Sequence, residues 1–68
     1  MYNYRIMYKY EGCLHDECHP MDDIGEAIDY AIWLYDTNSE LLTNTFVVND
    51  ATGEIEFDMQ AMIELCNE

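Results

Sequence analysis

Apolar and polar residues alternate along the first ten positions of the chain. Tyr2, Tyr4, Ile6, Tyr8 and Tyr10 fall on one face of an extended backbone, and Asn3, Arg5, Met7 and Lys9 fall on the other. A period of two that is rich in aromatic residues is typical of a half-buried strand, so the pattern predicts a strand over residues 2–10 with its tyrosine face in the core. Residues 11–21 contain a glycine and a proline, and we expect them to form a polar loop.

Apolar residues then recur at spacings of three and four, which predicts a helix from about Asp22 or Asp23 to Asp36. Its buried stripe is expected to consist of Ile24, Ala27, Ile28, Ala31 and Tyr35. Asp23 and Glu26 have the spacing of a capping box, and carboxylates in the first turn suit the positive end of the helix dipole.

The last third of the chain predicts a hairpin followed by a short helix. Strands over 44–49 and 54–57 flank a turn at 50–53, whose last residue, Gly53, suits a positive φ. In the second of these strands Ile55 and Phe57 are expected to point inward. Asp58 can cap the final helix. One face of that helix is expected to carry Met59, Met62, Ile63 and Cys66.

Together these elements predict a single α+β domain over residues 1–68, with a three-stranded antiparallel sheet and helices packed on one face. We expect strand 54–57 in the middle, because this order sets Arg5 and Lys9 beside Glu54 and Glu56, and opposite charges across strands are favourable. In the alternative order strand 44–49 is central, which would require a right-handed parallel crossover.

Charge is the extreme feature of the composition. Fifteen Asp and Glu residues face only Arg5 and Lys9, which gives a formal net charge of −13. This balance argues against direct nucleic-acid binding, which needs a basic face. It fits solubility or adaptation to high salt, or complementarity to a cationic partner.

The sequence indicates no export or membrane insertion. We find no signal peptide, and no apolar run approaches the ~20 residues of a membrane span. Three cysteines are an odd number, which fits a reducing compartment better than a disulfide scaffold. We therefore expect a cytoplasmic protein.

Trp33 lies opposite the buried stripe of the first predicted helix when residues are set at about 100° intervals. Around it, on the same outward face, are Asp22, Glu26, Asp29 and Asp36, with Tyr30 at the margin. Tryptophan is a preferred anchor at interfaces, and these carboxylates can meet Lys or Arg or imitate the spaced charges of a nucleic acid. Alternatively, Trp33 packs under the long loop or against the second helix, and the acids form an ordinary solvated face.

The loop after the first strand contains four residues that can bind zinc: Cys13, His15, Cys18 and His19. Their spacing is not that of a standard zinc knuckle, and Cys66 or a second subunit would be needed to complete a site. The alternatives are a reactive or disulfide-forming cysteine pair, or incidental loop residues.

No glycine-rich phosphate loop is present and no third group to orient a Cys–His pair is evident, so we expect no enzyme, no catalytic residue and no cofactor.

In its short length, acid excess, scarcity of cations and α+β order, the chain resembles small acidic proteins of bacteriophages and mobile elements that inhibit host defence, including anti-CRISPR proteins and other DNA mimics. The resemblance covers the whole chain in character and rests on no motif. It implies a partner that is a cationic nucleic-acid-binding protein or ribonucleoprotein complex in the host bacterial cytoplasm. Stretches 23–31 and 47–55 also resemble a small bacterial and phage domain with a Thr-Gly-Glu hairpin, which implies a fold only.

The alternative function is a zinc-stabilised or self-associating module, for example a homodimer paired through an open strand edge.

Overall fold

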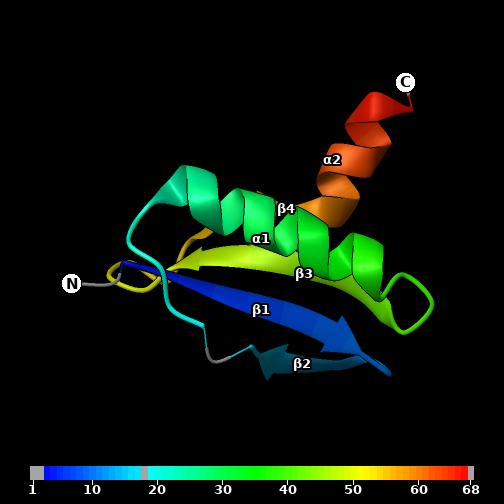
Figure 1. The fold of residues 1–68 in the computed structure, drawn as a ribbon, viewed down its shortest axis with the longest axis horizontal. Helices are drawn as coiled ribbons and strands as arrows, with labels where there is room; N and C mark the ends of the chain where they lie inside the picture. The colour runs from blue at the N-terminus through cyan, green and yellow to red at the C-terminus, as the bar shows by residue number, and fades with distance from the viewer. Residues whose placement is uncertain (1–2, 18, 68) are drawn as a thin grey trace.

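The computed structural model describes residues 3–17 and 19–67, and these form an α+β fold (Figure 1). In chain order the elements are β1 (Tyr4–Tyr10), β2 (Cys13–Asp16), α1 (Ile24–Thr37), β3 (Leu42–Asn49), β4 (Ile55–Asp58) and α2 (Met59–Cys66). The predicted α+β class and antiparallel sheet are confirmed. The predicted number of strands is wrong, because the sheet formed by the described residues has four strands rather than three.

The additional strand is β2, which lies within the segment expected to be a polar loop. Tyr10 pairs with Cys13 across a two-residue turn. Glu11 and Gly12 occupy that turn at φ values of 51° and 80°, and the favoured two-residue hairpin turn needs positive φ at both positions. All four residues of β2 are exposed, so this strand shows no alternation of buried and exposed positions that the sequence pattern could reveal.

The strand order is β2-β1-β3-β4, and every neighbouring pair is antiparallel. The expectation that strand 54–57 is central is therefore wrong, since β4 lies at an edge and β3 pairs directly with β1. The reason is the reversal of the chain at β2. Because α1 follows β2 rather than β1, the crossover connects β2 to β3, and these two strands are parallel to each other. β1 lies between them and is antiparallel to both.

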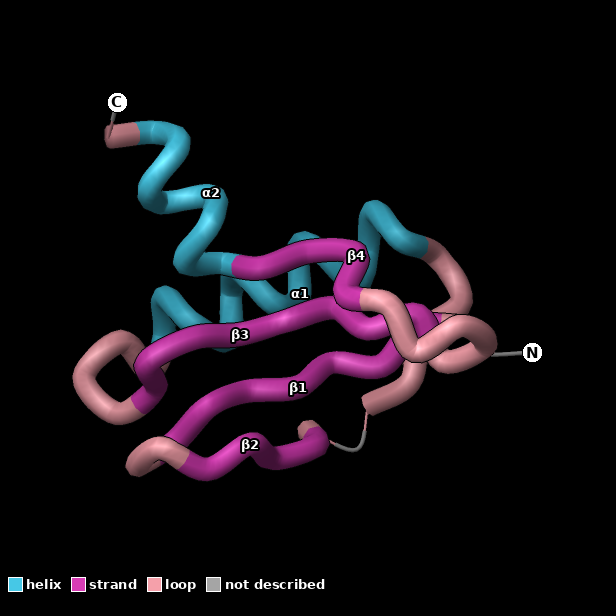
Figure 2. Tube along the Cα trace, turned by 180° about the vertical axis from the view of Figure 1, so that it is seen from behind, coloured by secondary structure: helices cyan, strands magenta, loops and turns pink. Residues whose placement is uncertain are grey.

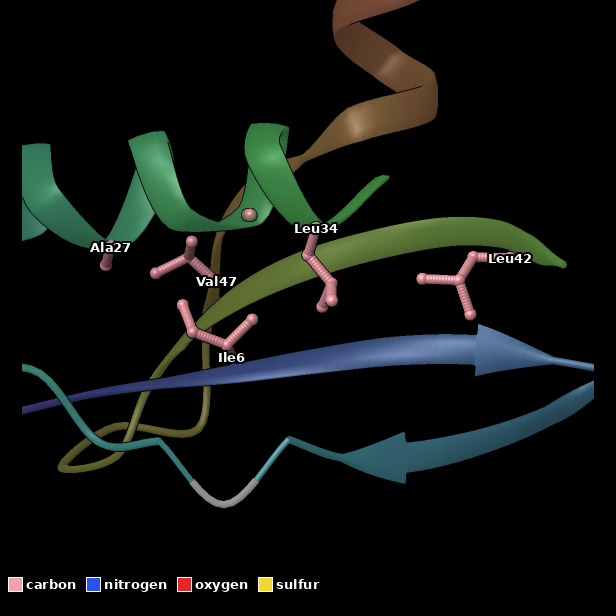
Figure 3. Packing of buried hydrophobic residues seen from close by; sticks show 6 residues of the cluster. Ile6, Ala27, Leu34, Leu42 and Val47 are labelled. Atoms are coloured by element: carbon pink, nitrogen blue, oxygen red, sulfur yellow. The ribbon is translucent and has the colours of Figure 1, made fainter. Parts of the chain in front are cut away.

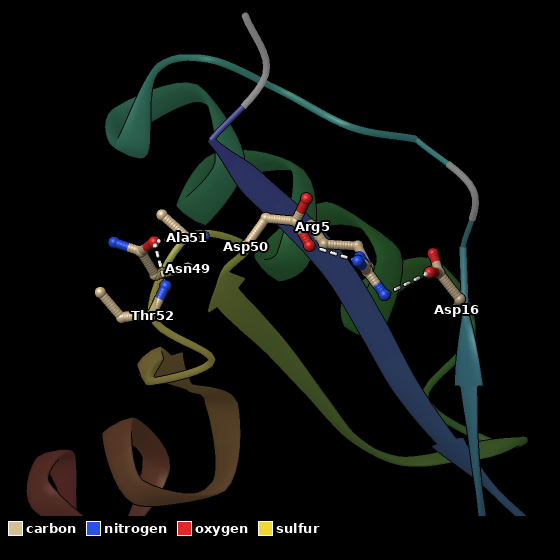
Figure 4. Close-up of polar contacts among 6 residues, drawn as sticks. All are labelled: Arg5, Asp16, Asn49, Asp50, Ala51 and Thr52. Atoms are coloured by element: carbon tan, nitrogen blue, oxygen red, sulfur yellow. Dashed lines mark hydrogen bonds and ion pairs between the residues drawn. The ribbon is translucent and has the colours of Figure 1, made fainter.

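Arg5 and Lys9, the two cationic residues of the chain, therefore do not have the neighbours that were predicted for them. Arg5 forms ion pairs with Asp16, at 3.4 Å, and with Asp50, so it links β2 to the β3–β4 turn across β1 (Figure 4). Lys9 is paired in register with Leu14 and Asn44. The predicted pairing of Arg5 and Lys9 with the two glutamates of the 54–57 segment is wrong, because β3 separates β4 from β1.

The core lies between α1 and one face of the sheet. Figure 2 shows the opposite face, which no described helix covers. Its buried cluster consists of Ile6, Ala27, Ala31, Leu34, Leu42 and Val47 (Figure 3). The tyrosines of β1 that the structure describes pack at the border of this cluster, as their alternation predicts, whereas Tyr2 lies outside the described residues.

Ile55 does not point inward as predicted, because 59% of its surface is exposed. The register of β4 on β3 shifts between Val47 and Val48, so Phe57 pairs with Val47 but Ile55 pairs with Val48. This irregularity breaks the alternation that the expectation assumed, and only Phe57 packs against the core.

A buried polar network fixes the start of α2. Asn44, with 8% of its surface exposed, donates from Nδ2 to Asp58 Oδ1 at 2.8 Å. Its Oδ1 accepts from the backbone N–H of Gln60 and of Thr45, both at 2.9 Å. Asp58 in turn accepts from Ala61 N–H at 3.2 Å, which confirms the predicted helix cap. One amide side chain thus holds β3, the end of β4 and the first turn of α2 together.

We expect Asn44→Ala to lower the free energy of unfolding by about 2–3 kcal/mol, because it leaves buried donors without acceptors. Urea denaturation measures this, and an uncharged denaturant avoids screening the acidic surface. Asn3→Ala, which truncates an exposed amide, is the matched control and is expected to change the midpoint little. Equal midpoints for the two variants would contradict a structural role for this network.

Candidate functional site

Trp33 projects from α1 away from the sheet, with 57% of its surface exposed. The alternative in which it packs under the loop or against the second helix is therefore wrong. The α1 residues that face the sheet explain this orientation, since Ala27, Ala31 and Leu34 are buried and a helix can bury only one stripe on one sheet. Leu34 belongs to that stripe although it was not among the residues predicted for it.

Carboxylates surround Trp33 on the helix surface. Asp29 precedes it by four residues and Asp36 follows it by three, which are the spacings of neighbours on a helix face. Glu26, two turns away, is also exposed, and its backbone N–H donates to the capping carboxylate of Asp23 at 3.3 Å. We call Glu26, Asp29, Tyr30, Trp33 and Asp36 the Trp33 face. Asp22, which was expected on the same helix face, is exposed but precedes the cap Asp23 and therefore lies outside α1. The helix itself has no Lys or Arg to neutralise it.

An aromatic row extends this face toward the segment that follows β2. The Tyr30 ring lies 5.6 Å from that of Trp33 in a tilted arrangement, and His19 stacks on Tyr30 with centroids 4.6 Å apart. Paired backbone hydrogen bonds between Met21 and Tyr4 (2.8 and 2.9 Å) hold the returning segment beside the first strand. The sequence pattern does not reveal this row, because His19 and Tyr30 come from separate segments.

The two histidines considered as zinc ligands have different ring partners. His15, on β2, stacks on Tyr8 at 5.3 Å, whereas His19 stacks on Tyr30. Across residues 3–17 and 19–67, no group of three or more His, Cys, Asp or Glu side chains is placed to hold a metal ion. Cys13 and Cys66 are exposed free thiols, and Cys18 lies outside the described residues.

The surroundings of Tyr30 change the ionisation of its hydroxyl. Partial burial, and then the negative charge of Glu17, raise the pKa of its hydroxyl above the ordinary value of 10.0. The hydroxyl is therefore protonated at neutral pH and can donate a hydrogen bond. The effect of Glu17 also indicates that its carboxylate lies near the aromatic row.

We expect the fluorescence of Trp33, the single tryptophan of the chain, to be quenched more strongly by Cs⁺ than by I⁻ at low salt, relative to a free tryptophan amide. The carboxylates around the ring concentrate cations and repel anions, and added salt should remove the difference. Neutral acrylamide reports exposure alone. The substitutions Asp29→Asn and Asp36→Asn should reduce the difference more than Glu54→Gln and Glu56→Gln. Identical relative quenching by both ions at low salt would contradict the acidic environment.

We expect Glu17→Gln to lower the pKa of Tyr30 part of the way toward its ordinary value, because burial, the larger cause, remains. The pKa of Tyr30 is higher in the folded than in the unfolded state, so the stability that this difference contributes to the fold is fully present below a pH of about 10. It is lost as pH rises from there through the raised pKa. Titration of the tyrosine ring carbons by NMR measures the shift. Glu64→Gln on α2 is the control, and an equal shift in that variant would refute the proximity of Glu17.

No family model, curated protein or solved structure matches this chain. Neither described helix is long and apolar enough to cross a membrane. The exposed, acidic and aromatic Trp33 face is thus the feature from which a function can be inferred.

Proposed function

We propose that this chain is a binding protein that inhibits a nucleic-acid-binding protein or ribonucleoprotein complex by occupying its cationic groove. The observation that carries the proposal is an exposed tryptophan among carboxylates on a helix without a Lys or Arg. Binding, rather than catalysis, is the activity that this surface supports. The resemblance to anti-defence proteins suggests a host defence complex, such as a CRISPR effector, as the partner.

The aromatic and acidic residues of the Trp33 face have complementary roles in such a complex. Trp33 offers a large exposed surface that a partner can desolvate, and tryptophan commonly dominates binding energy. Tyr30, partly buried between the core and His19, supports the Trp33 ring from one side. The carboxylates attract a basic groove over a distance of about a Debye length and meet its Lys and Arg side chains on contact. The net charge of −13 adds to this attraction.

The spacing of the acids supports competition with nucleic acid. Glu26, Asp29 and Asp36 span about 15 Å along α1 at a rise of about 1.5 Å per residue. A groove that binds DNA neutralises phosphates through several Lys and Arg side chains over such a distance. An acidic helix in that groove would occupy the same cations and exclude the nucleic acid.

Self-association is the second candidate function, and the sheet edges support it. β2 and β4 are the edge strands of the described sheet, and Leu14 and Ile55 on them are 56% and 59% exposed. Edge strands can pair between copies. Light scattering across a concentration series separates the candidates, since a stable homodimer that Leu14→Lys converts to monomer would support this alternative.

We expect the triple variant Glu26→Gln, Asp29→Asn, Asp36→Asn to bind the partner at least about tenfold more weakly, and Trp33→Ala to dissociate faster. The partner is first isolated from host lysate by elution with a salt gradient and identified by mass spectrometry. Surface plasmon resonance at several salt concentrations then measures affinity, and displacement of the partner's labelled nucleic acid measures inhibition.

The control for this experiment is Glu54→Gln, Glu56→Gln, Glu64→Gln, which removes the same number of charges from β4, its preceding turn and α2. The proposal requires a clearly smaller effect from this control than from the Trp33-face variant. Binding that does not weaken with salt, or a partner that binds the chain and its nucleic acid at once, is incompatible with it.

A further inference from the structure

A pocket of about 330 Å³ opens beside the end of α1 from which the loop to β3 departs. Its lining consists of Tyr8 and Tyr10 of β1, Glu17, Leu34 and Asn38 of the α1 end, and Leu41 and Leu42 at the start of β3. Leucine side chains and tyrosine rings make its walls largely apolar. Glu17 supplies the one formal charge among these lining residues, so the pocket combines an aromatic wall with a carboxylate.

Neighbouring residues hold both of these groups in place. His15 stacks on Tyr8 at 5.3 Å and lies 6.2 Å from Tyr10, which supports the rings from β2. Glu17 is half-buried, and its backbone N–H donates to the carbonyl of Ile6 at 3.0 Å. The paired strand β1 and the packed end of α1 thus form part of the wall, and Glu17, Asn38 and Leu41 add residues from the segments between elements.

The chemistry of the lining selects a cation with a flat, partly apolar body. A guanidinium group can stack on a tyrosine ring, interact with its π face and pair with a carboxylate, while the methylene stem contacts the leucines. Glu17 and the overall charge disfavour an anion. The volume is near the lower end of the roughly 300–1,000 Å³ range of ligand pockets, which suits one side chain better than a cofactor.

We propose that this pocket binds an arginine side chain. That the arginine belongs to the partner's cationic groove rests on the function proposed above. The pocket adjoins the Trp33 face through Glu17, which lines the pocket and whose charge acts on Tyr30. One arginine would insert between α1 and β1 while neighbouring cations meet the carboxylates of the helix.

The test is a titration of the isotope-labelled chain with N-acetyl-arginine amide, followed by NMR. We expect saturable shifts at the backbone amides of Tyr8, Tyr10, Leu34 and Leu41, and no such shifts with the uncharged citrulline analogue at matched ionic strength. The lysine analogue, which lacks the planar group, should bind more weakly.

Substitutions identify the groups responsible. Glu17→Gln should weaken binding of the arginine probe about tenfold. Glu56→Gln, which removes the same charge from β4, should leave binding unchanged, and Tyr8→Phe should retain it because the ring remains. The amide spectrum of each variant first establishes that the fold is intact.

Shifts that do not saturate, equal shifts with the citrulline analogue, or equal weakening by Glu17→Gln and Glu56→Gln would overturn the inference. Its failure is distinguishable from failure of the proposed function. If arginine does not bind but substitutions on the Trp33 face weaken the partner complex, only the pocket inference fails. If arginine binds as expected and those substitutions have no effect on the complex, the pocket inference stands and the proposed function fails.

Discussion

The close packing of α1 on the central strands is the contact on which the other features of the molecule depend. Ala27 and Ala31 are fully buried, and their small side chains bring the helix backbone near Ile6 and Val47. Thr45 Oγ1 donates to the Ala31 carbonyl at 3.0 Å, so the contact is also hydrogen-bonded. A domain of 68 residues has little other apolar surface to bury. Since this alanine stripe faces the sheet, the opposite side of α1 is exposed to solvent.

Outside this core, the negatively charged carboxylates at the surface repel one another. The buried polar residues of the described chain, Asn44 and Thr45, are neutral, so the carboxylates are left at the surface. Arg5 relieves part of the repulsion by bridging Asp16 and Asp50 on either side of β1. No cation of α1 does the same for the Trp33 face. The repulsion that opposes folding there is also what would attract a cationic partner, so salt is expected to act in opposite directions on stability and on binding.

Features that depend on neighbours within a few residues could be predicted. Asp23 and Asp58 cap their helices as their positions indicate, and Gly53 has the positive φ expected for its turn. The helical periodicity placed Trp33 opposite the buried stripe, and its exposure agrees. The α+β class followed from the order of these local patterns. Whether the Trp33 face binds a partner is a matter of chemistry that the fold leaves open to experiment.

The sequence by itself thus determined the helices, three of the four strands in the described chain, and the outward direction of Trp33, because caps and periodicities act along a single segment. Only the tertiary structure decided the strand order, the partners of Arg5, the stacking of His19 on Tyr30 and the pocket beside Glu17. Each of these depends on which distant segments meet, and the chain reversal at Glu11 and Gly12 adds the strand that pairs with β1 at the sheet edge. A four-residue exposed strand leaves no periodic signal in the sequence, yet it sets the sheet edge from which the chain crosses over through α1 to β3.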